Sequence, residues 1–66
     1  MQIHVNGEAM QLPDGATLMD LLAALKLLDA RVAVELNQEI VPRSWHTEQG
    51  LQDQDQIEIV HAIGGG

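Results

Sequence analysis

The chain has 66 residues, enough for one small domain and too few for a second hydrophobic core. Hydrophobic residues make up 45% of the chain but aromatic residues only 2%, so Leu, Ile, Val, Met and Ala must build the core. Ten acidic residues against three basic ones give a formal charge of -7, which argues against nucleic acids and anionic membrane surfaces as partners.

The chain contains no cysteine, which excludes disulfides, thiol catalysis and cysteine-bound metals. The first residues carry neither the basic region of an export signal nor an apolar run long enough to span a membrane, so a cytoplasmic location is expected. The acidic surface has two interpretations, attraction to a basic patch on a protein partner or solubility alone.

The first predicted element is a β-hairpin. Ile3 and Val5 alternate with polar neighbours, the pattern of a half-buried strand, and Asn6-Gly7 is a strong signal for a two-residue turn. We expect the return strand at residues 8–12.

A helix is predicted next. Thr17 precedes Asp20 by three residues, a variant of the capping box, so the helix should begin at Leu18. Leucines at spacings of three and four form one apolar stripe that should pack on a sheet: Leu18, Leu21, Leu22, Leu25 and Leu28.

Three further strands are predicted in the second half of the chain. Residues 32–36 alternate in hydrophobicity, residues 40–41 form a short edge strand before Pro42, and residues 57–60 form the last strand after a polar, turn-rich stretch. This order of elements predicts an α+β fold, with one helix packed across a mixed sheet of about five strands. We expect one domain over residues 1–63 and a flexible glycine tail over residues 64–66.

The three terminal glycines have no side chains to pack, so the tail should be mobile and able to enter a narrow channel. The tail carries one reactive group, the α-carboxylate of Gly66. This carboxylate is ionised at neutral pH and is a poor electrophile until a partner enzyme attaches a leaving group such as AMP. The glycines alone are also compatible with a frayed end or a cloning remnant.

Two segments resemble a known family. Residues 34–43 read Val-Glu-Leu-Asn-Gln-Glu-Ile-Val-Pro-Arg, and residues 53–66 end in Ala-Ile-Gly-Gly-Gly. Together with residues 1–7 and 14–15, they resemble the ThiS family of sulfur carriers in thiamine biosynthesis over essentially the whole chain. The chain departs from that family at Gln54, where the family usually has glycine, and at Trp45, since the family's tryptophan commonly sits one position later. The resemblance implies a ubiquitin-like β-grasp, in agreement with the predicted order of elements.

The resemblance also implies a carrier that is not itself an enzyme and binds no cofactor. An E1-like adenylyltransferase would use ATP to adenylate Gly66, sulfur from a persulfide donor would give a thiocarboxylate, and thiazole synthase would take the sulfur. Gly64 and Gly65 would give the tail access to the partner's channel. The carrier alone is expected to be a monomer.

Several other residues have both a functional and a structural interpretation. Ala62 and Ile63 would seat the tail on a partner, or Ile63 would end the last strand in the core. Asp53, Asp55 and Glu58 would dock on arginines of the activating enzyme, or belong to a solvated turn. Residues 37–43 would face a partner, although a tight turn and an edge strand are favoured there.

The three histidines are weighed as metal ligands and rejected. His4, His46 and His61 contain no pair at i,i+4 spacing. His4 and His61 would be neighbours if the first and last strands pair, but two ligands do not make a strong site.

Three alternatives to the thiamine carrier stay open. The small subunit of molybdopterin synthase has a similar fold and a Gly-Gly end, although it is usually longer and richer in aromatic residues. A non-covalent ubiquitin-like binding module would use its sheet face and not its tail. A modifier would be joined to lysines of target proteins by isopeptide bonds.

Overall fold

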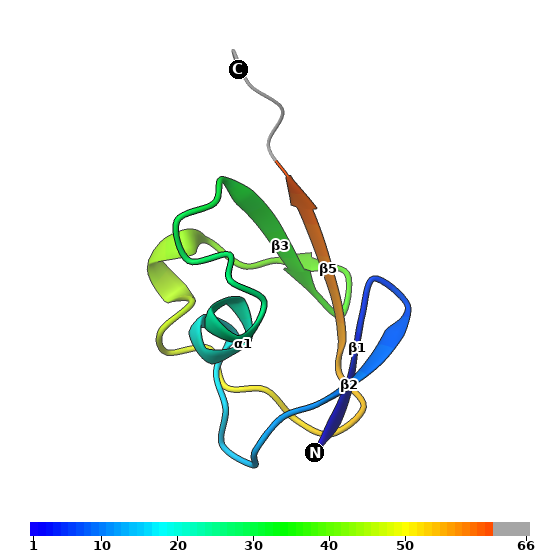
Figure 1. Cartoon of the computed structure of the whole chain (residues 1–66). Coiled ribbons are helices and arrows are strands. Elements are labelled where there is room, and N and C mark those ends of the chain that lie inside the picture. Colours follow the sequence, from blue (N-terminus) through cyan, green and yellow to red (C-terminus); the bar gives the residue numbers. More distant parts are fainter. Residues whose placement is uncertain (62–66) are drawn as a thin grey trace.

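The computed structural model describes residues 1–61, which form a five-stranded mixed sheet with one helix packed across one face (Figure 1). The elements are β1 (Gln2–Val5), β2 (Glu8–Gln11), α1 (Leu18–Ala24), β3 (Val32–Leu36), β4 (Glu39–Ile40), the 3-10 helix η1 (Arg43–Trp45) and β5 (Gln56–His61). The strands lie in the order β2-β1-β5-β3-β4, with β1 and β5 parallel and the other pairs antiparallel. The predicted α+β class and β-grasp arrangement are confirmed, while the predicted tail lies outside the described residues.

Both hairpins turn through two residues in the left-handed backbone region. Asn6 and Gly7 have φ values of 51° and 85°, and Asn37 and Gln38 have φ values of 51° and 72°. Such turns match the twist of the strands that they join. The return strand of the first hairpin ends one residue earlier than predicted, and the predicted edge strand at residues 40–41 instead begins and ends one residue earlier.

Helix α1 begins at Leu18, as predicted from the capping box. The Asp20 amide donates to Thr17 Oγ1 at 3.2 Å, and the Thr17 amide donates to Asp20 Oδ2 at 2.9 Å. The first two backbone amides of the helix, those of Leu18 and Met19, have no acceptor within the helix. They donate to backbone carbonyls of the loop after η1 at 3.0 Å each. This loop therefore closes the N-terminus of the helix.

The prediction that the helix continues to Leu28 is wrong. The helix ends at Ala24, and Lys26 adopts a left-handed conformation with φ 61°. The Lys26 and Leu27 amides donate to the carbonyls of Ala23 and Leu22 at 3.0 and 2.8 Å, the two bonds of a Schellman motif. Leu28 therefore lies beyond the helix and is 45% exposed.

The core lies between α1 and the covered face of the sheet. Its buried side chains are all aliphatic, as the composition predicted: Ile3, Leu12, Ala16, Leu18, Leu21, Leu22, Val34, Val41, Leu51, Ile57 and Ile59. In β5, Ile57 and Ile59 belong to this core, whereas Glu58 and Val60 are exposed on the opposite face. The central strand is thus fixed by packing on one side and leaves its other side open.

Candidate functional site

The candidate site follows strand β5 in the sequence. This strand occupies the centre of the sheet and is the last element of the described chain. It pairs with β3 along its length, from Leu36 opposite Ile57 to Val32 opposite His61. Figure 1 shows β5 between β3 and β1, with its last residues at the end of the sheet away from the N-terminus. The predicted tail residues lie outside the described residues, so their roles stay predictions: Ala62, Ile63, Gly64, Gly65 and Gly66.

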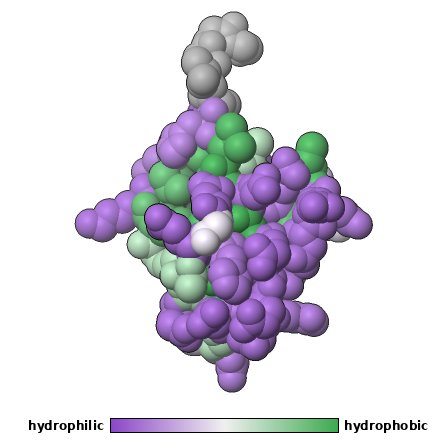
Figure 2. Space-filling view, turned by 90° about the vertical axis from the view of Figure 1, so that its right-hand side faces the viewer, coloured by the Kyte–Doolittle hydropathy of each residue, from purple (hydrophilic) through white to green (hydrophobic). Residues whose placement is uncertain are grey.

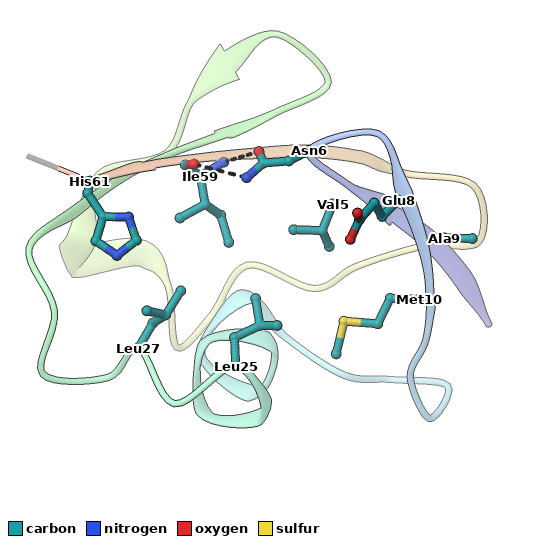
Figure 3. Close-up of a pocket in the computed structure, with 9 residues that line it drawn as sticks. All are labelled: Val5, Asn6, Glu8, Ala9, Met10, Leu25, Leu27, Ile59 and His61. Atoms are coloured by element: carbon teal, nitrogen blue, oxygen red, sulfur yellow. Dashed lines mark hydrogen bonds between the residues drawn. The ribbon is translucent and has the colours of Figure 1, made fainter.

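A side-chain amide extends the pairing of β5 beyond the end of β1. The two strands pair only through His4 with Gln56 and Val5 with Ile57. Asn6 then places its Oδ1 2.9 Å from the Ile59 amide and its Nδ2 3.2 Å from the Ile59 carbonyl oxygen (Figure 3). The Asn6 side chain thus replaces one further residue of β1. The sequence assigned Asn6 only to the turn, because this contact depends on the register of a distant strand.

A hollow of about 450 Å³ adjoins the end of β5 on the helix side. Figure 3 shows Val5 and Ile59 pointing into it from the sheet, Leu25 and Leu27 from the segment at the end of α1, and His61 at one end. The early end of the helix helps to leave this space open, because the chain turns away after Leu25. The end of β5 therefore has an apolar recess beside it.

The opposite face of the sheet combines apolar and acidic side chains. Val60 is 58% exposed and lies opposite Ala33, while Glu58 lies opposite Glu35. Figure 2 views the side of the molecule away from α1, where hydrophobic surface gathers mainly in the upper half and hydrophilic surface surrounds it. Two carboxylates placed directly opposite each other repel, and Glu35 and Glu58 concentrate negative charge on this face.

Asp53 and Asp55 lie in the turn before β5, at the opposite end of the strand from the chain's exit. Asp53 Oδ1 accepts a hydrogen bond from the Gln2 amide at 2.7 Å. This bond, with a second from the Gln54 side chain, lowers the pKa of Asp53 below its usual 3.8. Asp55 Oδ1 accepts a hydrogen bond from Asn37 Nδ2 at 3.1 Å. Both carboxylates thus stabilise the turn, and their predicted docking role, like that of Glu58, stays a prediction.

The histidines are not brought together. The first and last strands do pair, but the parallel register places Gln56 beside His4, so this pairing does not make His4 and His61 neighbours. His46 is only 2% exposed, and its Nε2 lies 3.1 Å from the Val41 carbonyl oxygen. Within residues 1–61, no three histidine or carboxylate side chains are placed to hold a metal ion.

Position 46 is the buried aromatic position of the loop after β4. The resemblance places a tryptophan there, whereas in this chain His46 is buried and Trp45 is 61% exposed. In this chain the histidine therefore packs inward and the indole of Trp45 faces solvent.

Among the described residues, no helix has the length and apolar character needed to cross a membrane.

These features define a small protein of the ubiquitin-like β-grasp class whose central strand is also the last element of the described chain. The model of the ThiS family matches residues 3–66, and the chain belongs to this family. The predicted resemblance is confirmed.

Individual relatives agree with this assignment. The chain is 42% identical over 66 residues to the sulfur carrier protein ThiS of Escherichia coli, and the match covers all of both chains. The crystal structure of a thiamine biosynthesis protein (ThiS) from Geobacter metallireducens superimposes with a TM-score of 0.86 at 33% identity, covering all of both chains. The chain is also 47% identical to part of a thiazole synthase from Magnetococcus marinus, of which it spans only 20%.

Proposed function

We propose that this protein is a sulfur carrier for the formation of the thiazole of thiamine. The observation that carries the proposal is the match of residues 3–66 to the ThiS family, which includes the Gly-Gly-Gly end. Full-length relatives named as sulfur carrier protein ThiS support the carrier role. By this proposal the working group is the Gly66 carboxylate, with Gly65 and Gly64 giving access to the partner's channel.

The chemistry begins with attack of the Gly66 carboxylate on the α-phosphorus of ATP, which forms an acyl adenylate and releases pyrophosphate. The terminal sulfur of a persulfide then attacks the acyl carbon, and AMP leaves. The product is an acyl disulfide that keeps the S–S bond of the persulfide. A thiol then attacks the donor's sulfur in this bond, so that the thiocarboxylate leaves and a disulfide forms between the thiol and the donor. The absence of cysteine from this chain means that none of its own thiols competes for the sulfur.

The proposed partners are an E1-like adenylyltransferase, a persulfide donor and thiazole synthase. Thiazole synthase has the most direct support, because two relatives with this name contain a segment similar to the whole of this chain. ATP and sulfur reach the carrier through the partner enzymes, so the carrier itself is neither the catalyst nor the holder of a cofactor. Its ATP-dependent loading is consistent with a cytoplasmic location.

The experiment that tests this function detects sulfur on Gly66. The protein is purified with its natural C-terminus after incubation with ATP, a sulfur source and the candidate adenylyltransferase, and then treated with iodoacetamide. High-resolution mass spectrometry of the last peptide should show one alkyl adduct, which no cysteine can mimic in this chain.

Two controls make the result specific. Omission of ATP should abolish the adduct, and so should deletion of Gly65 and Gly66. If the complete reaction gives no adduct, the carrier function is wrong and a non-covalent binding module becomes the better explanation. Relatives named as thiazole synthase, and a solved structure named for thiamine biosynthesis, favour thiazole synthase over molybdopterin synthase as the sulfur acceptor.

A further inference from the structure

The two most exposed large hydrophobic side chains of residues 1–61 line the same hollow. Ile40 is 75% exposed and Trp45 is 61% exposed. They line a recess of about 280 Å³ at the edge of the sheet, together with Leu36, Val41 and Pro42. We call this recess the Trp45 hollow. Exposed apolar side chains gathered in one recess mark a contact surface, since isolated ones are ordinary.

The edge of the sheet beside this hollow has free backbone groups. The Val41 amide donates to the Val34 carbonyl at 2.9 Å, which makes these two residues a hydrogen-bonded pair. The preceding pair, Glu35 and Ile40, is therefore a non-hydrogen-bonded pair, and the Ile40 N–H and C=O point away from β3. Strand β4 is the outermost strand, so these groups are available to an incoming segment.

Acidic side chains flank the hollow. Glu39 lines it, and Glu48 lines a neighbouring recess that also includes Trp45. Among residues 1–61, the one ion pair joins the Met1 amino group to Asp14, so both glutamates lack a cationic partner there. The basic residue nearest to Trp45 in sequence, Arg43, lines a different recess.

We propose that the Trp45 hollow binds an arginine-bearing segment of a partner protein. A guanidinium group can stack on the exposed indole and at the same time donate hydrogen bonds to the carboxylate of Glu48, which lines a recess with Trp45. Arginine fits this combination better than lysine because its planar group both stacks and forms paired hydrogen bonds. An apolar neighbour of the arginine would contact Ile40.

The hollow is separate from the exit of the chain. Ile40 lies opposite Glu35, which lies opposite Glu58, three residues before His61. From strand geometry, the hollow is displaced from the end of β5 by roughly 10 Å along the strand and roughly 10 Å across two strand spacings. A partner can therefore hold the carrier here without occupying the recess beside His61. The choice of partners to test rests on the proposed function.

The single tryptophan provides the readout. The carrier is labelled with 5-fluorotryptophan, and its one fluorine resonance is followed by NMR during titration with unlabelled thiazole synthase and, separately, with the adenylyltransferase. At least one enzyme should shift or broaden this resonance on binding. In calorimetric titrations with that enzyme, Trp45→Ala should weaken binding at least about tenfold and Trp45→Phe by less.

Matched variants test whether binding depends on the Trp45 hollow itself or on exposed apolar and acidic side chains in general. Leu28→Ala removes another exposed apolar side chain and should change the affinity less than about twofold. Glu48→Gln should weaken binding at low salt and reduce its salt dependence. Full affinity of Trp45→Ala for both enzymes would overturn the proposal, and an unchanged salt dependence in Glu48→Gln would overturn the arginine assignment. Absence of binding by the wild-type protein to either enzyme would instead contradict the proposed function, and the proposal with it.

Discussion

Replacement of Asn6 tests how the end of β5 is held in the sheet. Its side chain makes two partly buried hydrogen bonds to the backbone of Ile59, each worth about 1 kcal/mol net. Its backbone also has φ 51°, which costs a residue such as alanine about 1 kcal/mol but is tolerated by glycine and aspartate. Three variants therefore separate the hydrogen bonds from the backbone conformation.

Destabilisation should increase from Asn6→Asp through Asn6→Gly to Asn6→Ala. Asn6→Asp keeps the acceptor for the Ile59 amide and loses one bond, so it should cost about 1 kcal/mol. Asn6→Gly loses both bonds and should cost about 2 kcal/mol, while Asn6→Ala adds backbone strain and should cost about 3 kcal/mol. For a domain of this size, the loss of 2 kcal/mol lowers Tm by about 8–16 °C.

Urea unfolding followed by circular dichroism gives the free energy of unfolding for each variant, and hydrogen exchange adds a local test. In Asn6→Gly, the exchange rate of the Ile59 amide should rise relative to wild type. This rise should exceed that of the β3 amides that pair with the other edge of β5. If Asn6→Gly costs less than about 0.5 kcal/mol, the side chain does not stabilise β5. If Gly and Ala variants are equally stable, the backbone argument is refuted.

Three further predictions concern the helix and the turn before β5. Leu21→Ala opens a cavity in the core and should lower the free energy of unfolding in urea by about 3 kcal/mol. Leu28 lies beyond the end of α1, so Leu28→Ala should lower it by less than about 0.5 kcal/mol. Equal losses would contradict the observed helix end. Lys26→Gly relieves the left-handed backbone and should raise stability by about 1 kcal/mol, and a loss of stability would disprove that strain. The pKa of Asp53 is lower in the folded state, so its charge stabilises the fold above the usual value of 3.8, and this contribution is lost as pH falls through the folded value. The stability difference between wild type and Asp53→Asn should therefore shrink in acid, and a difference that is constant with pH would refute the linkage.

Local signals in the sequence predicted most of the fold. The Asn6-Gly7 turn, the capping box at Thr17 and the alternation in the strands each depend on neighbouring residues only, and each is present in the structure. The end of α1 was missed because the leucine spacing continues through Leu25 and Leu28. Lysine in a left-handed C-terminal cap gives no sequence signal of the kind that glycine gives.

The candidate site was predicted less completely, because much of it depends on contacts between distant segments. The side-chain amides of Asn6 and Asn37 form hydrogen bonds with β5 or with the turn before it. No sequence pattern around either residue predicts these bonds. The parallel register that separates His4 from His61 is likewise set by packing across the sheet. The glycine tail was predicted from composition and resemblance, and its roles rest on the same grounds.

The central place of β5 has a mechanical consequence for the proposed carrier. A partner that draws the chain into a channel pulls on β5 along its own axis. Because this pull is parallel to the strand, the hydrogen bonds to β1 and β3 share the load in shear, whereas a pull perpendicular to the strand would open them one after another. The domain should therefore act as a stop that resists traction, so that a partner can hold the end under tension while the domain stays folded.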